Sequence, residues 1–293
     1  MDWAEFAGVV LGAEVVDLSA LIMTLSWSRK RAVAWSRSKD MLSWQSCNMA
    51  CLRRLGGSVA VLRIDNVKTA IARGAGARGV INETYRRFAA QPNFHVDACQ
   101  PRHPEGKGKV ERHVRDLRGT VDPRKEAFDS LEELQAVTDA RLEERAGRLR
   151  CPATGTSVAE AWEQERRLLT PFPETLPEPF DIVVRRPVGI DCLVSFEGRQ
   201  YSVPFRFVGQ DVEVRGLAAH VQILKNGEVI AMHPRRTERL IVCDDAHFEG
   251  DDTDRVRAPM PLGKMGRGLQ ALAASNVQQR SIDIYARLAE VAR

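Results

Sequence analysis

The sequence predicts a mixed α/β domain followed by a small antiparallel β domain. Three consecutive β segments open the chain and strand and helix patterns then alternate, which is typical of a layered α/β fold. Beyond about residue 180 the apolar residues recur with a period of two, as they do in half-buried strands. A chain of 293 residues with 44% hydrophobic residues is long enough for one large domain and one small domain.

The first three β segments are expected over residues 2–10, 14–28 and 29–36, joined by short turns. The middle segment is almost wholly apolar, which indicates a strand that is buried on both faces. Its end and the next segment interleave Trp27 and Trp35 with four basic residues, Arg29, Lys30, Arg31 and Arg37. This pattern fits either a nucleic-acid surface or an exposed basic hairpin, and the hairpin is the favoured interpretation.

Helix signals begin with Asp40, which lies in a capping-type sequence before a helix expected over 40–55. Gly56 and Gly57 end that helix, and a strand over 58–64 leads into Asp65. Helices are then expected over 67–73 and 81–90, and a short strand over 94–99. We assign residues 1–125 to this α/β domain.

Residues 126–180 are predicted to be a helical connector and linker. They contain a strongly amphipathic helix over 130–150 and a second helix over 157–169. The following run TPFPETLPEPF holds four prolines, which cannot continue a helix and indicate a linker.

Residues 181–236 are predicted to form a small antiparallel β-barrel. Short alternating segments are separated by turn sequences, including Glu197-Gly198 and Asn226-Gly227, and Asn-Gly is a strong hairpin signal. The tail, 237–293, is acidic at first and is expected to end in a helix over 277–291.

Charge and cysteine content narrow the class of protein only slightly. The net charge of +4 permits a nucleic-acid partner without demonstrating one. The six cysteines are scattered, which favours free thiols in a reducing cytoplasm, and Cys47 and Cys51 are expected to face the core together. His95, Cys99 and His103 have a spacing that suggests zinc, but no fourth ligand is evident and structural zinc is disfavoured.

Three carboxylates occupy positions that favour a metal site. Asp2 begins the first strand, Asp65 ends the strand over 58–64, and Glu111 opens a helix after a loop rich in proline and glycine. Sites in α/β proteins form beyond strand ends, where a helix N-terminus can also reach. Carboxylates without His or Cys suit Mg²⁺, and two such ions can activate an attacking oxygen and stabilise the departing one at phosphorus.

Several motifs resemble those of a known family. Asp-Trp-Ala-Glu-Phe at 2–6, Ile-Asp-Asn-Val-Lys-Thr-Ala at 64–70 and Gly-Lys-Val-Glu at 108–111 are similar to the three acidic motifs of IstA-type insertion-sequence transposases. These enzymes belong to the DDE superfamily, with retroviral integrases and the phage Mu transposase. The segments 194–204, 212–215 and 227–234 are similar to the barrel that follows the catalytic core in that family.

The resemblance implies a ribonuclease H-like catalytic core of the integrase type, and metal-dependent cleavage and strand transfer of DNA at transposon ends. It implies that Asp2, Asp65 and Glu111 bind two Mg²⁺ ions, for which Mn²⁺ can substitute, with Asn66 as a neighbour. The expected contacts to DNA phosphates are Lys68, Lys107, Lys109, Arg112 and Arg115. Implied partners are DNA, a helper ATPase of the AAA+ class and further copies of the chain, in the cytoplasm and without a membrane.

The chain departs from the family pattern at its front. The helix-turn-helix region that reads transposon ends is absent before Asp2, as are residues that would precede it in its own strand. We therefore expect a truncated transposase. The alternatives are a catalytically silent remnant that binds DNA or takes part in assembly, and a metal-dependent nuclease of the same fold without a joining step.

Overall fold

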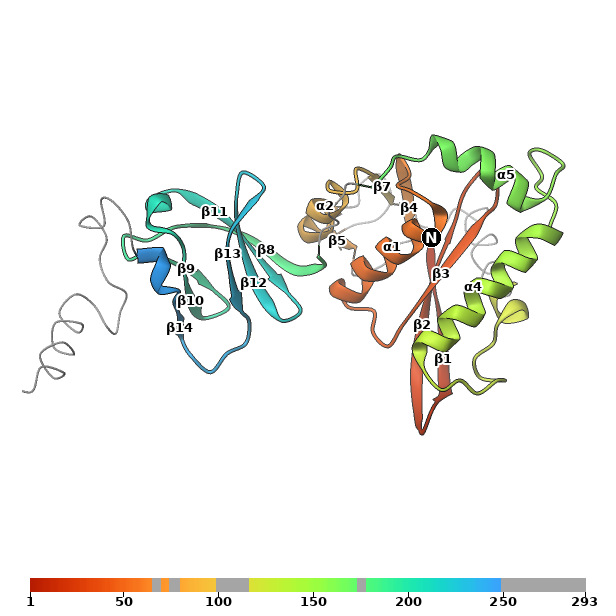
Figure 1. Cartoon of the computed structure of the whole chain (residues 1–293), viewed down its shortest axis with the longest axis horizontal. Helices are drawn as coiled ribbons and strands as arrows, with labels where there is room; N and C mark the ends of the chain where they lie inside the picture. The colour runs from red at the N-terminus through yellow and green to blue at the C-terminus, as the bar shows by residue number, and fades with distance from the viewer. Residues whose placement is uncertain (65–69, 74–79, 99–115, 173–177, 249–293) are drawn as a thin grey trace, which may run out of the picture. The chain divides into compact units, whose positions relative to one another are not determined.

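The computed structural model describes residues 1–64, 70–73, 80–98, 116–172 and 178–248 (Figure 1). This part of the chain divides into two compact units. The first comprises Met1–Val183 with Arg215–Ala219, and the second comprises Val184–Val214 and the chain from His220 onward. The described helices include none that is long and apolar enough to cross a membrane.

An antiparallel sheet forms the centre of the first unit. Its strands are β1 (Asp2–Leu11), β2 (Glu14–Thr24) and β3 (Arg31–Ser36), in the order β1-β2-β3. The three predicted strands are confirmed, although β2 ends four residues before the predicted position. The chain turns there, with the Leu25 amide donating to the Lys30 carbonyl at 2.9 Å and Arg29 at a φ of 67°.

Both faces of this sheet are buried, as the apolar middle strand predicts. Alternate residues of each strand point to opposite faces. One face contributes Ala4, Phe6, Leu18, Ala20, Ile22, Val33 and Trp35 to one core cluster. The other face contributes Leu21, Met23, Ala32 and Ala34 to a second cluster.

Helix α1 (Met41–Leu55) packs in the second cluster. The Asp40 carboxylate accepts from the Ser43 amide at 2.8 Å, and Gly56 ends the helix at a φ of 93°, so both predicted helix signals are confirmed. Trp44 is fully buried, and its ring centroid lies 5.8 Å from that of Trp3 on β1. Cys47 is buried too, as expected, and burial raises the pKa of its thiol to about 12.

A parallel strand pair lies in the same unit. Strand β4 (Val61–Ile64) pairs with β7 (His95–Ala98), and α2 (Glu83–Ala89) lies between them in sequence. The predicted helix over 67–73 is wrong at its end, because β5 (Ile71–Arg73) pairs antiparallel with β6 (Val80–Ile81). Helix propensity over so short a run is a weak prior, and strand pairing with the nearby segment β6 outweighs it.

The connector helices are α4 (Leu131–Arg148) and α5 (Val158–Glu165). Ser130 and Ser157 cap their N-termini, and Ser157 forms a capping box with Glu160. The second helix ends earlier than predicted and continues as a 3₁₀ turn, η2 (Arg166–Leu168).

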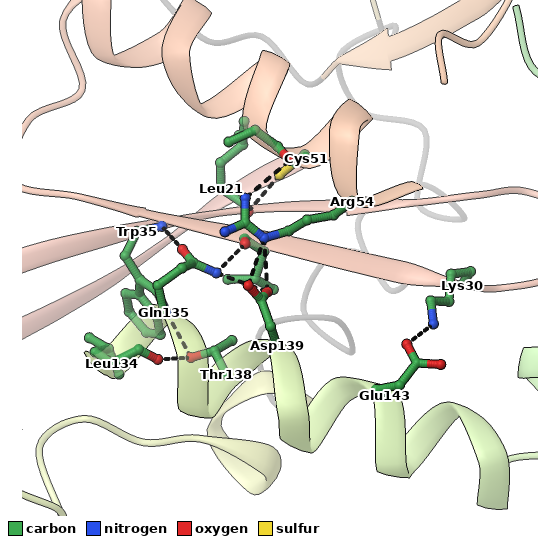
Figure 2. A network of polar contacts seen from close by, with 12 residues as sticks. Leu21, Lys30, Trp35, Cys51, Arg54, Leu134, Gln135, Thr138, Asp139 and Glu143 are labelled. Carbon is green, nitrogen blue, oxygen red and sulfur yellow. Dashed lines mark hydrogen bonds and ion pairs between the residues drawn. The ribbon is translucent and has the colours of Figure 1, made fainter. Parts of the chain in front are cut away.

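Helix α4 binds the outer edge of β3, the last strand of its sheet, through the side-chain amide of Gln135 (Figure 2). Gln135 Oε1 accepts from the Trp35 amide at 3.1 Å, and Gln135 Nε2 donates to the Val33 carbonyl at 3.0 Å. The amide thus takes the place of a neighbouring strand's peptide group. Two further contacts hold the helix there: Arg54 Nε lies 2.9 Å from both oxygens of Asp139, and Trp35 Nε1 donates to Thr138 at 2.9 Å.

The second unit is built from short strands, as the change in periodicity predicts. Strands β8 (Phe180–Pro187), β11 (Asp211–Leu217), β12 (His220–Lys225) and β13 (Glu228–Pro234) form a sheet in the order β13-β12-β11-β8. A second sheet, in the order β14-β10-β9, contains β9 (Leu193–Phe196), β10 (Arg199–Ser202) and β14 (Ile241–Val242). Asn226 and Gly227 have φ values of 52° and 89°, as the predicted hairpin turn requires.

Candidate active site

Asp2 is the one predicted metal ligand within the described residues. It is half-buried at the start of β1, where it pairs with Ile22 of β2, and its Oδ1 accepts from the Trp3 amide at 2.8 Å. By the alternation of the strand, Asp2 lies on the same face as Ala4 and Phe6.

A hydrogen bond joins the residue before β1 to β4. The Met1 ammonium donates to the Arg63 carbonyl at 2.7 Å. Asp2 follows Met1, and Ile64, the last residue of β4, is followed in sequence by Asp65. The beginning of the first strand therefore lies beside the strand that leads to the second predicted carboxylate.

A helical segment over residues 116–120 covers the sheet face to which Asp2 belongs. Leu117 is fully buried there in one core cluster with Ala4 and Phe6. In sequence, Glu111 precedes Asp116 by five residues.

The other predicted site residues lie outside the described residues. These are Asp65, Asn66, Lys68, Lys107, Lys109, Glu111, Arg112 and Arg115. Of the weighed zinc ligands, His95 is exposed on β7, and Cys99 and His103 lie outside the described parts. Within the described ranges, no three His, Cys, Asp or Glu residues form a group that could hold a metal ion.

The expectation of an exposed basic hairpin over residues 29–37 is wrong at its centre. Lys30 is buried, forms an ion pair with Glu143 of α4 (Figure 2) and lies 4.4 Å from the centroid of the Trp162 ring. Trp35 is buried as well, whereas Arg29 and Arg37 are exposed. Lys30 therefore stabilises helix packing, because the connector helices supply both of its partners.

Sequence reasoning missed a cluster of charges next to the 116–120 segment. Asp116 lies 3.4 Å from Arg31 of β3 and 3.8 Å from Arg145 of α4. Burial lowers the pKa of Arg31, Asp116 raises it in part, and the charge of Arg145 lowers it further. The spacing of Arg141, Arg145 and Arg148 along one side of the amphipathic helix was the signal that could have found it.

The fold and Asp2 define the class of protein. It is a mixed α/β protein with an acidic residue at the start of the first strand, next to the end of β4, which belongs to a parallel strand pair. Comparison with known proteins narrows this class. The family described as Mu transposase, C-terminal domain, matches residues 172–243.

Three curated relatives are similar over most of the chain. A putative transposase for insertion sequence element IS5376 of Geobacillus stearothermophilus is 28% identical over 79% of this chain and 57% of its own length. The transposase for insertion sequence element IS21 of Pseudomonas aeruginosa is 28% identical over 79% of this chain and 59% of its own. A putative transposase of Mycobacterium tuberculosis is 30% identical over 76% of this chain and 55% of its own length.

The predicted resemblance to IstA-type insertion-sequence transposases is thus confirmed, and the chain is a relative of these proteins. It spans somewhat more than half the length of these three relatives. Among solved structures, a chain of the simian T-cell lymphotropic virus intasome, in complex with the PP2A regulatory subunit B56 gamma, superposes with a TM-score of 0.42. That superposition has 14% identity and covers 83% of this chain and 77% of the viral chain.

Proposed function

We propose that this chain is a DDE-type DNA transposase that carries out metal-dependent cleavage and strand transfer at the ends of an insertion sequence. In this proposal the first unit contains a ribonuclease H-like core, and the second is a small β-barrel. The observation that carries the proposal is the hydrogen bond between Met1 and Arg63, because it brings the start of β1 to the end of β4.

Chain geometry supports the convergence of two of the three acids. Asp65 follows Arg63 by two peptide steps, a reach of at most about 7.6 Å between Cα atoms. Asp2 follows Met1 by one step. Asp2 and Asp65 are therefore one and two residues away from Met1 and Arg63, which a 2.7 Å hydrogen bond joins.

The position of the 116–120 segment supports Glu111 as the third ligand. Leu117 packs against the same face of β1 to which Asp2 belongs. Glu111 lies six residues before Leu117. In this proposal, all three carboxylates would meet at one end of this sheet face.

The residues fit a hard divalent cation, since the proposed ligands are carboxylate oxygens alone. Two bound Mg²⁺ or Mn²⁺ ions would supply activation of the attacking oxygen and stabilisation of the leaving oxygen at phosphorus. Asp2, Asp65 and Glu111 would hold the ions, and Asn66 would lie next to them. Lys68, Lys107, Lys109, Arg112 and Arg115 would orient DNA by contacting its phosphates.

The proposed partners follow from the relatives, which are transposases for insertion sequences. They are transposon and target DNA, a helper ATPase of the AAA+ class, and further copies of this chain assembled on the DNA.

The test is strand transfer of DNA with a free 3′ end, in Mg²⁺ or Mn²⁺. Asp65→Asn and Glu111→Gln are each expected to reduce the rate by at least about 100-fold, because each change removes a negatively charged metal ligand. Glu132→Gln, which neutralises an exposed carboxylate in the first turn of α4, is the matched control and is expected to keep full activity.

Equal activity of the two site variants and the control would reject the proposed site. DNA binding without strand transfer in either Mg²⁺ or Mn²⁺ would support the alternative of a catalytically silent DNA-binding protein. Cleavage without joined product would favour a nuclease.

A further inference from the structure

We propose that a cavity between the 116–120 segment and the last turns of α4 binds a phosphate group of the DNA backbone. The cavity has a volume of about 330 Å³ and is lined by Gly119, Thr120, Arg141, Glu144, Arg145 and Arg148, among others. This inference rests on the proposed function, which supplies DNA as the phosphate-bearing ligand.

The lining is predominantly cationic because of the helix repeat. Arg141, Arg145 and Arg148 are spaced four and three residues apart, so their side chains leave α4 on one side. Three arginines and one glutamate, Glu144, are thus among the residues that line the cavity.

Two of these arginines already have carboxylate partners. Arg141 forms a bidentate pair with Glu126, with Nη1–Oε1 and Nη2–Oε2 distances of 2.7 and 2.6 Å. Arg148 pairs with Glu144, but its side chain is 78% exposed. An exposed pair of this kind contributes little to stability, so Arg148 can exchange its partner for a phosphate at small cost.

Arg145 has hydrogen-bonding capacity left over. Its Nη2 lies 3.8 Å from Asp116, a carboxylate that also binds Arg31. Its Nε is buried, and no acceptor among the described residues bonds to it. A guanidinium has five donors, and a buried donor without an acceptor is costly.

The carboxylate of Asp116 lies beside two guanidinium groups, 3.4 Å from Arg31 and 3.8 Å from Arg145. A phosphodiester bound in the cavity would add a negative charge close to Arg145. Its two free oxygens match the planar fork of a guanidinium, which makes arginine well suited to phosphate.

The test measures the affinity of the chain for a fluorescently labelled DNA duplex. Binding is detected by fluorescence anisotropy, in EDTA, at a series of salt concentrations. The variants are Arg145→Gln, Arg148→Gln and the double variant, and the matched control is Arg167→Gln, which removes one exposed charge from η2. Arg145→Gln and Arg148→Gln, which each remove one charge as the control does, are each expected to bind more weakly than the control, and the double variant about three- to tenfold more weakly than the unaltered chain. For each phosphate that the variant no longer neutralises, the slope of log K against log salt should become shallower by about 0.9.

Two results would overturn the inference: an unchanged salt slope in the double variant, or an equal loss of affinity in Arg167→Gln. Arg148→Gln alone remains informative if Arg145→Gln unfolds, since the Arg148 side chain is mostly exposed. Thermal melts establish which variants are folded.

A second arm separates DNA from a free anion. Inorganic phosphate and pyrophosphate are titrated by calorimetry into the full chain and into the double variant. Phosphate binding that is abolished in the double variant, with unchanged DNA affinity, would overturn the assignment to DNA. Because all binding is measured in EDTA, it does not depend on metal at the proposed catalytic site. Failure of the catalytic proposal, read from strand transfer, and failure of this one, read from metal-free binding, are therefore distinguishable.

Discussion

Arg235, in the second unit, has a charged side chain that is only 1% exposed. Glu197 holds it with two hydrogen bonds, Nε–Oε2 at 2.8 Å and Nη2–Oε1 at 2.7 Å. The same hydrogen bonds are the main cause of a lowered pKa at Glu197. The pair therefore fixes the β9–β10 turn to the end of β13.

We expect Glu197→Gln to destabilise the second unit by about 1–3 kcal/mol, because it leaves the Arg235 charge buried without its carboxylate partner. Chemical denaturation followed by far-UV circular dichroism measures this. Glu238→Gln, an exposed carboxylate in the same unit, is the control, and an equal effect of the two variants would contradict the argument.

Two histidines form a second polar cluster in this unit. The Ser202 hydroxyl accepts from the Asp244 amide at 2.9 Å and lies within hydrogen-bond distance of His247 Nδ1, at 2.8 Å. His233 Nε2 donates to the Ser202 carbonyl at 2.7 Å. Burial lowers the pKa of both histidine rings, and this effect is larger than the opposite effect of the Asp244 charge. Tyr201 packs beside His233.

A lowered pKa in the folded state means that the neutral ring is favoured by folding. The stability this contributes is present above the ordinary histidine pKa of about 6.5 and is lost as the pH falls below it. We expect the melting temperature of the second unit to fall between pH 7 and pH 5, and His247→Ala to flatten that dependence. His220→Ala, at an exposed position, should leave it unchanged. Equal curves for His247→Ala and the unaltered chain would refute this.

The candidate site could be predicted from sequence only in part. Asp2 stays a predicted ligand, chosen because it begins a strand, and the structure brings that strand start to β4. The burial of Lys30 was not predictable, since its partners Glu143 and Trp162 lie more than 100 residues away. The unequal sharing of Asp116 by two arginines likewise depends on three separate elements.

At the scale of elements, helix ends were the most predictable feature, because caps are local. Asp40, Gly56, Ser130 and Ser157 each act within three or four residues of their own position. Strand β5 was missed because a run of three residues carries little periodicity of its own, and its pairing with β6 decides its conformation. The limits of β2 were overestimated because apolar Leu25 continues the pattern into the turn.

The docking of α4 on β3 depends on Gln135, and this gives a prediction. Gln135→Ala removes the partners of the Trp35 amide and the Val33 carbonyl and should cost about 1–3 kcal/mol. Urea denaturation followed by tryptophan fluorescence measures the loss. Gln164→Ala, at an exposed position of α5, is the control, and equal midpoints would show that the Gln135 amide contributes nothing.

At the scale of the whole molecule, the two units should unfold separately. All five tryptophans, Trp3, Trp27, Trp35, Trp44 and Trp162, belong to the first unit. Tryptophan fluorescence therefore reports on that unit alone, whereas far-UV circular dichroism reports on both. We expect transitions that do not coincide, and we expect Glu197→Gln to shift the circular dichroism transition but not the fluorescence transition. Coincident shifts in both signals would indicate one cooperative molecule.

Burial of the cysteines has a practical consequence for labelling. Cys47, Cys51, Cys151 and Cys192 are buried, and a thiol with a pKa near 12, such as that of Cys47, supplies almost no thiolate to a maleimide at neutral pH. Cys243 is exposed in the second unit. Cys151 differs, because desolvation raises the pKa of its thiol less than hydrogen bonds from Thr154 and the Ala153 backbone together lower it, so that the pKa is lowered. With Cys99 and Cys151 changed to serine, a dye at Cys243 would accept energy from the tryptophans of the first unit. The chain thus carries its own donor and acceptor positions for measuring how far apart its two units stand when DNA is added.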